Sequence, residues 1–238
     1  MNPSYLIIGN GRVAKHLSHY FNLLGLQNQQ YHYKDSIERL EQKLQNSTHI
    51  LVLIKDDAIE DFIKTNLLDR CTNKLIIHCS GALQSQYAYS AHPLMTFGDK
   101  LLDLETYKSV PFICESESLE FKYLMPNLPN KDYYIDPSNK TYYHALCAIA
   151  NNFTTILWQE IKNRFETQLK MDFKVMLPIM HQTIKNIDND IDNALTGPLK
   201  RNDHLIINKH LESLKNDELS NLYQEFVKLY KRKSTIVE

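Results

Sequence analysis

The chain has 238 residues, enough for one large domain or two small ones with a buried core. Its formal net charge of -1 and pI near 6.8 exclude the basic surface that attracts nucleic acid or anionic lipid, and no run approaches the roughly 20 apolar residues that span a bilayer. The four cysteines form no C-x-x-C pair and the amino terminus has no basic and apolar leader, so we predict a cytoplasmic protein without a zinc site, disulfides, or nucleic-acid or membrane partners.

The chain opens with a short apolar strand, residues 5–8, that runs directly into G-x-G-x-x-A from Gly9 to Ala14. Gly9 can adopt the positive backbone angles of a tight turn, and Gly11 lets the main chain approach a pyrophosphate. Apolar residues at helical spacing follow, so the next amides form a helix N-terminus, which favours phosphate binding. We predict that this turn binds a dinucleotide through Gly9, Asn10, Gly11, Arg12 and Val13. The alternative is a glycine-rich turn without a ligand, in which the Arg12 side chain is solvated.

Strand and helix patterns alternate through the first half of the chain, which is typical of βαβ units around a mostly parallel sheet. We predict a helix after the glycine turn, a second at 37–44, and a third that opens with a capping box from Asp57 to Glu60. The expected strands are residues 5–8, 29–33, 49–54, 75–79, 90–92, 110–114 and 133–135. These elements form a predicted α/β Rossmann domain over residues 1–136.

From residue 137 onward the pattern is helical, with no strand-like run. The expected helices cover residues 142–165, 173–187, 204–214 and 217–230, and Pro178 either kinks or starts the second of them. We predict an all-helical substrate and dimerisation domain over 137–238. Because no glycine-serine linker separates the two halves, we expect them to pack closely around a cleft at the carboxyl ends of the strands.

Four segments are distinctive in combination: G-N-G-R-V-A from Gly9, H-C-S-G-A-L from His78, A-H-P-L-M-T-F from Ala91 and A-L-T-G-P-L-K-R-N-D from Ala194. Together they resemble a bacterial family of Rossmann-like proteins whose helical carboxy-terminal domain has no assigned function. That family is similar to the group of 6-phosphogluconate dehydrogenase, 3-hydroxyisobutyrate dehydrogenase, ketopantoate reductase and pyrroline-5-carboxylate reductase. The resemblance implies an NAD(P)-binding domain, a helical domain like that of 6-phosphogluconate dehydrogenase that often builds a homodimer, and an oxidoreductase acting on a small polar carbonyl, imine or hydroxy acid.

Residues at two strand ends bear on the cofactor. Lys34 stands where similar proteins often carry an arginine, and a basic side chain there favours the 2′-phosphate of NADP, whereas Asp35 suits the ribose of NAD. Asp35 is equally a candidate N-cap that forms a box with Glu38, and Lys34 an exposed strand-end charge. Ser80 and Gly81 end the fourth main strand, where backbone amides bind the nicotinamide ribose or a substrate carboxylate, or simply form a turn. We predict NADP, with NAD as the alternative.

The catalytic residues are predicted from a departure from the resembled group. Its β-hydroxyacid dehydrogenase and ketopantoate reductase branches carry a lysine followed four residues later by an asparagine, and the lysine exchanges a proton with the substrate oxygen. Here Asn152 is preceded at that spacing by Ala148, so the lysine is missing. We expect His144 or His92 to replace it as the proton donor, with Asn152 orienting the substrate. The alternatives are structural roles for both histidines and a helix-helix contact for Asn152.

The turn-rich segment 194–203 contains Arg201, whose planar guanidinium suits a substrate carboxylate. The alternative is that Asp203 caps the next helix and pairs with Arg201 to fix the loop. The missing lysine also supports a second interpretation of the whole chain, as a sensor or scaffold protein that binds NADP without turning over a substrate.

Overall fold

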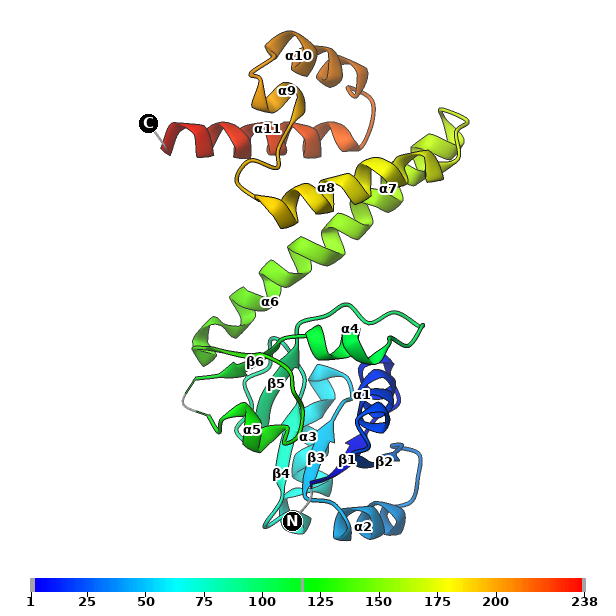
Figure 1. The fold of residues 1–238 in the computed structure, drawn as a ribbon, viewed down its shortest axis with the longest axis vertical. Helices are drawn as coiled ribbons and strands as arrows, with labels where there is room; N and C mark the ends of the chain where they lie inside the picture. Colours follow the sequence, from blue (N-terminus) through cyan, green and yellow to red (C-terminus); the bar gives the residue numbers. More distant parts are fainter. Residues whose placement is uncertain (1–2, 117, 237–238) are drawn as a thin grey trace. The chain divides into compact units, whose positions relative to one another are not determined.

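The computed structural model describes residues 3–116 and 118–236, with the side chains of 233–236 left out. The chain divides into two compact units, Met1–Leu157 and Trp158–Glu238. The first unit holds the sheet and its covering helices, and the second is entirely helical in its described part (Figure 1).

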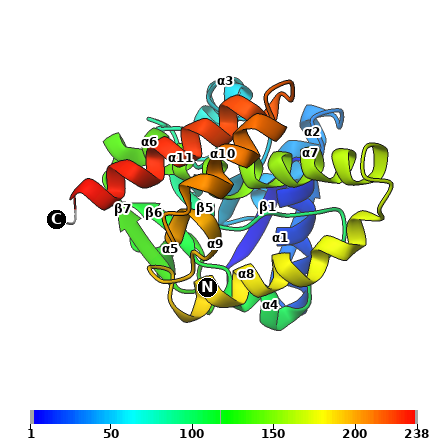
Figure 2. The ribbon, with the colours of Figure 1, turned by 90° about the horizontal axis from the view of Figure 1, so that it is seen from above.

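One seven-stranded sheet, in the order β2-β1-β3-β4-β5-β6-β7, forms the centre of the first unit. Neighbouring strands from β2 to β5 are parallel, β6 runs antiparallel to β5, and β7 is parallel to β6. The last three strands lie side by side in Figure 2. The predicted Rossmann-type sheet is confirmed. Its strands are β1 (Ser4–Ile8), β2 (Gln27–Tyr31), β3 (His49–Val52), β4 (Leu75–His78), β5 (Tyr89–Pro93), β6 (Phe112–Glu115) and β7 (Asp132–Ile135).

The second strand lies two residues earlier than predicted, because residues 32–35 form a turn. The Asp35 amide donates to the His32 carbonyl at 2.8 Å, and the Asp35 carboxylate accepts from the His32 amide at 3.3 Å. The strand therefore stops at Tyr31, and Lys34 stands in the turn rather than at the strand end.

Helices cover both faces of the sheet. One apolar core lies under α1 (Arg12–Leu23), α4 (Leu104–Ser109) and α5 (Phe121–Leu124), and α1 and α4 lie next to each other in Figure 1. A second core lies under α2 (Ile37–Gln45) and α3 (Asp56–Asn66). Burial on both faces explains why β1 and β3 read as nearly continuous apolar runs.

Two predicted helix caps are wrong. Ser36, not Asp35, caps α2 by accepting from the Arg39 amide, while Asp35 forms an ion pair with Arg39 at 3.4 Å. Helix α3 starts at Asp56, one residue before the predicted capping box, and has no side-chain cap. The Asp56 carboxylate is instead bound by Ser80 from the next strand end, a tertiary contact that local pattern does not reveal.

A continuous helical segment leads from the first unit into the second. It consists of α6 (Lys140–Ala148), a π-helical stretch (Ile149–Phe153) and α7 (Thr154–Thr167), after a 3-10 turn at Pro137–Asn139. This agrees with the predicted helix at 142–165, although the π-helical stretch between His144 and the end of that helix interrupts the regular spacing.

The remaining helices follow the predicted order. Pro178 lies in the first turn of α8 and so starts that helix rather than kinking it. The second unit also contains a partly buried ion pair in which Arg164 on α7 binds both carboxylate oxygens of Asp217 at 2.8 Å. The helices are α8 (Leu177–Asn189), α9 (Gly197–Lys200), α10 (His204–Ser213) and α11 (Leu219–Ile236), with a 3-10 turn at Phe173–Met176. Over the described residues, no helix has the length and apolar character needed to cross a membrane.

A fully buried histidine ends the fourth strand. The Ser80 amide donates to Nδ1 of His78 at 3.2 Å, so the proton of the neutral ring is on Nε2. Nε2 has no hydrogen-bond partner among the described groups. Burial, together with the nearby charges of Lys140 and His92, lowers the pKa of His78 to about 3.

This burial predicts a loss of stability in acid. The unfolded chain protonates His78 near pH 6.5 and the folded chain only near pH 3, so the contribution is complete above pH 6.5 and lost as the pH falls toward 3. We expect His78→Asn to lose about 2 kcal/mol less unfolding free energy than the wild type between pH 7 and pH 5, measured by urea denaturation. His204→Gln, at an exposed position, is the matched control and should follow the wild type. Equal acid sensitivity of His78→Asn and wild type would contradict the prediction.

Candidate functional site

A cleft of about 990 Å³ opens at the carboxyl ends of the first strands. The glycine turn forms one wall, the segment after β3 and one side of α3 form another, and Cys79 and Ser80 form the far end. Strand β1 lies between β2 and β3, so the turn stands where the strand order reverses, which is the usual ligand position in open α/β sheets. All five predicted residues of the turn line this cleft: Gly9, Asn10, Gly11, Arg12 and Val13.

The protein's own backbone requires glycine at one of the two glycine positions of the turn and not at the other. Gly9 has φ of +128°, and a Cβ at this position would lie 2.2 Å from the Leu53 carbonyl oxygen, so only glycine fits. Gly11 has φ of −67°, and a Cβ at this position would have no other atom within 4 Å, so the protein itself does not require glycine there. The open space above Gly11 is available to a ligand.

The N-terminus of α1 faces this space. Gly11 precedes the helix without any side-chain cap, and the first intrahelical bond runs from the Lys15 amide to the Gly11 carbonyl. The amides of the first turn therefore have no capping side chain, and they stand at the positive end of a twelve-residue helix. This geometry suits a phosphate or pyrophosphate group.

Charged side chains border the cleft. Arg12 lines it, and its guanidinium donates to Asp99 at 3.0 Å through an exposed ion pair. Tyr33 also lines the cleft, and the Lys34 ammonium lies 5.9 Å from the centre of the Tyr33 ring. Asp35 is already bonded to Arg39 and to the His32 amide, so its carboxylate is held within its own loop.

Ser80 holds the far end of the cleft in place. Its hydroxyl donates to Asp56 at 2.5 Å and accepts from the Ala82 and Leu83 amides, while its own amide is bonded to His78. The Ser80 amide is therefore used within the turn, as the alternative to ligand binding predicted, although the residue also lines the cleft.

Gly81 brings the two candidate histidines together. A Cβ on Gly81 would lie 2.6 Å from Cδ2 of His144 and 3.1 Å from Nε2 of His92. The two imidazole rings stand perpendicular with their centres 5.9 Å apart. His92 comes from β5 and His144 from α6, so tertiary structure assembles at Gly81 a pair that is 52 residues apart in sequence.

His92 is held by a residue that the sequence analysis did not identify. Its Nδ1 lies 2.8 Å from the hydroxyl of Tyr143, which belongs to α6. Burial lowers the pKa of His92 to about 4, with further contributions from His144 and Lys140, so the ring is neutral at pH 7. When the Tyr143 hydroxyl donates this bond, the imidazole proton is on Nε2, the nitrogen that faces Gly81.

A buried lysine was also missed. Lys140 begins α6, and its ammonium donates to Glu115 and to Ser90, both at 2.7 Å. Its side chain is 3% exposed. Its spacing in the sequence could have identified it. Tyr143 lies three residues after Lys140 and His144 four residues after it, so all three share one helix face.

The other two predicted residues are Asn152 and Arg201. Asn152 is exposed in the π-helical stretch, where its side chain accepts from Asn151, and none of the described contacts joins it to either histidine. Arg201 is exposed at the end of α9 in the second unit. Asp203 caps α10 by accepting from the Ile206 amide, as the alternative predicted, but among the described residues it forms no ion pair with Arg201.

Comparison with known proteins identifies a domain type for the later part of the chain. Residues 114–229 match a family model described as a domain of unknown function, DUF2520. The curated proteins give no significant match.

Solved structures match along nearly the whole chain. A Bacteroides fragilis protein provisionally described as an NADP oxidoreductase has 22% identity and a TM-score of 0.76, covering 96% of this chain and 98% of that one. A Thermotoga maritima protein has 23% identity and a TM-score of 0.73, covering 96% and 97%. Pyrroline carboxylate reductase from Plasmodium falciparum, solved with NADP bound, has 14% identity and a TM-score of 0.60, covering 98% of each chain.

At these identities the similarity establishes the fold. The chain therefore has a Rossmann-like domain followed by a helical part, the architecture that its sequence resemblance predicted, and residues 114–229 carry the match to the domain of unknown function.

Proposed function

We propose that this protein is an NAD(P)-dependent oxidoreductase that acts on a small polar carbonyl, imine or hydroxy acid. One observation carries the proposal: the glycine turn and Ser80 line the same cleft, and the space beside the next residue, Gly81, is occupied by His92 and His144. A dinucleotide with its pyrophosphate at the turn would extend toward two titratable side chains. The solved oxidoreductases of the same fold support this choice of chemistry.

The residues present fit a dinucleotide cofactor. The uncapped start of α1 and the open space above Gly11 suit the pyrophosphate. We propose NADP, with NAD as the alternative, because the Lys34 ammonium is exposed beside Tyr33 at the cleft while the competing carboxylate of Asp35 is bonded within its loop. The Plasmodium falciparum relative in fold was solved with NADP, which supports the same preference.

The chain's own task is to hold a proton and orient the substrate. The bound nicotinamide would supply or accept the hydride. His92, neutral and hydrogen-bonded at Nδ1, presents Nε2–H toward Gly81, where it can donate to a substrate oxygen or nitrogen as charge develops. A neutral imidazole acts here as an electrophile. His144 stands edge-on to it, and we retain Asn152 and Arg201 as proposed substrate contacts from the helical part.

We further propose a homodimer formed through the helical part. Five apolar side chains on the α6–α7 segment are about half exposed or more and recur at positions i, i+4, i+7, i+11 and i+14. These residues follow one another along one continuous helical segment that includes the π-helical stretch, and we call them the stripe; exposed apolar surface of this kind is what a second helix covers. Its members are Tyr142, Leu146, Ile149, Phe153 and Ile156.

Cofactor binding tests the proposal at Gly11. Gly11→Ala leaves the fold intact, because its backbone is ordinary and its Cβ meets nothing, but places a methyl group where the pyrophosphate would approach. We expect NADPH affinity, measured by calorimetry, to fall roughly tenfold or more. Gly98→Ala has equally open space away from the cleft lining and should bind like the wild type. Failure of the wild type to bind either NADPH or NADH would contradict the proposed function.

Turnover tests the role of His92. With NADPH and a panel of keto acids, aldehydes and cyclic imines, and with NADP⁺ and a panel of hydroxy acids, we expect His92→Gln to lower kcat by about 10² to 10⁴ while cofactor affinity is kept. Tyr143→Phe should have a smaller effect in the same direction, because it removes only the bond to Nδ1. Unchanged turnover in His92→Gln would overturn its assignment as proton donor. Tight NADPH binding without any turnover would favour the sensor or scaffold interpretation.

The mass in solution tests the dimer. We expect the wild type to be a dimer by light scattering, and Phe153→Glu to shift it toward monomer because a charge would be buried within the stripe. Leu205→Glu changes a leucine that is 67% exposed on α10, outside the stripe, and should leave the mass unchanged. A monomeric wild type would contradict this assignment.

A further inference from the structure

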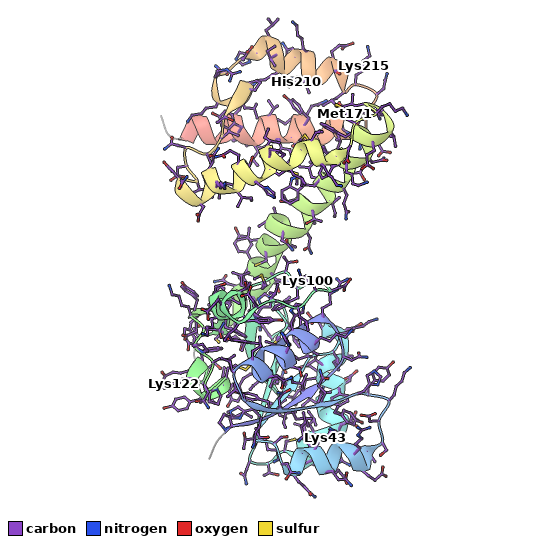
Figure 3. All side chains as sticks on the ribbon, turned by 45° about the vertical axis from the view of Figure 1, so that its right-hand side comes forward. Lys43, Lys100, Lys122, Met171, His210 and Lys215 are labelled. Atoms are coloured by element: carbon purple, nitrogen blue, oxygen red, sulfur yellow. The ribbon has the colours of Figure 1, made fainter. Side chains whose placement is uncertain are left out.

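Lys140 ties the start of helix α6 to the sheet. Its ammonium donates to Ser90 on β5 and to Glu115 on β6, two adjacent strands, with both distances at 2.7 Å. The other lysines of this unit that Figure 3 labels are on its outside: Lys122, for example, is exposed and pairs with Glu120, also at 2.7 Å. The same kind of ion pair thus occurs both at the surface and in the interior.

The buried ion pair is not expected to make the fold more stable than apolar residues would. Removing an ammonium and a carboxylate from water costs several kcal/mol per ion, and well-packed apolar residues of similar volume are often as stable. The ammonium does, however, tie the first turn of α6 to two strands, to β5 through Ser90 and to β6 through Glu115. Positions three and four residues later lie on the same helix face, and these are Tyr143 and His144.

Both of those side chains meet the candidate proton donor. The Tyr143 hydroxyl lies 2.8 Å from Nδ1 of His92, and the His144 ring stands perpendicular to the His92 ring at 5.9 Å. Ser90 is two residues before His92 on β5, so their side chains project from the same face of the sheet. The bonds of Lys140 and of Tyr143 therefore hold one helix turn against one stretch of strand.

The groups around His92 come from four elements. Lys140, Tyr143 and His144 face it from α6, His78 from β4 and Glu115 from β6, while Ser90 is on its own strand. Glu115 is bonded to the ammonium rather than to an imidazole, so no described carboxylate hydrogen-bonds to His92 to favour its protonated form.

We propose that Lys140 is a positioning residue: through Ser90 and Glu115 it sets α6 so that Tyr143 binds Nδ1 of His92 and the Nε2 atom of the same ring faces Gly81. This inference rests on the proposed function, since it assigns the support of the group that would donate the proton. Lys140 itself touches no reacting atom. Its role is to hold the helix turn that positions His92.

The test is a histidine NMR titration of the full-length protein, which reports the pKa and the tautomer of His92 without any substrate. In the wild type we expect His92 to stay neutral with the proton on Nε2 down to about pH 4. Lys140→Met combined with Glu115→Gln removes the pair without leaving a buried charge. In this double variant we expect the pKa of His92 to rise toward its ordinary value and the single tautomer to be lost.

Three variants make the result interpretable. Lys140→Arg keeps the charge and the bonding capacity and should restore the wild-type titration. Glu115→Gln leaves the ammonium uncompensated and should lower the pKa of His92 further, which tests the charge if the double variant does not fold. Lys122→Met removes the exposed pair with Glu120 and should change nothing.

The outcomes separate this inference from the proposed function. If His92 in the wild type titrates near its ordinary pKa, or if a folded double variant keeps the wild-type pKa and tautomer, the role of Lys140 is overturned. Neither result affects NADPH binding at the glycine turn, which is measured separately. If the double variant binds NADPH as the wild type does but loses kcat with KM unchanged, the positioning role is supported together with that of His92.

Discussion

The close approach of two backbone segments at Gly9 determines where a ligand can bind. The chain leaves β1 with φ of +128° and passes so near the Leu53 carbonyl that no side chain fits. This contact turns the chain away from the sheet and directs the start of α1 into the cleft. Without it the uncapped amides of α1 would not face the open space above Gly11, and the cleft would lack its phosphate-binding wall.

A second constraint acts where α6 meets the sheet. Solved structures with this fold include enzymes that reduce different kinds of substrate, so the fold alone does not decide the chemistry. A set of polar groups lies between α6 and the strands β4 to β6. A cationic side chain, a hydroxyl and three imidazoles lie close together there, with one carboxylate bonded to the cation. Burial, with the nearby cation, lowers the pKa of His78 and of His92 and so favours their neutral forms.

The catalytic lysine of the resembled group is missing from this chain, and the structure places a different lysine near the histidines. At the expected position, four residues before Asn152, the helix carries alanine, and the nearby asparagines are exposed in a π-helical stretch. The lysine that the structure does place near the histidines is Lys140, two turns earlier and bonded away from the cleft. Proton transfer in this chain therefore points to imidazole rather than to an amine, with the cation in a supporting position.

Local sequence determined most of the architecture. Apolar runs, the glycine spacing and helical periodicity predicted the strands, the Rossmann turn and the helical second half, because each depends on neighbours within a few residues. Helix caps were less predictable: Ser36 caps α2 in place of the neighbouring Asp35, and α3 starts at Asp56, whose carboxylate is bound by Ser80 from another segment.

The site itself was decided only by tertiary structure. His92 and His144 were identified as candidates from their residue type and from the motifs and helix that contain them, but nothing local showed that they meet at Gly81, or that Tyr143 and Lys140 complete the group. Those contacts join β5, β6 and α6 across long sequence separations. A charge buried by such contacts leaves no periodic pattern, because its partners are set by packing rather than by spacing along the chain.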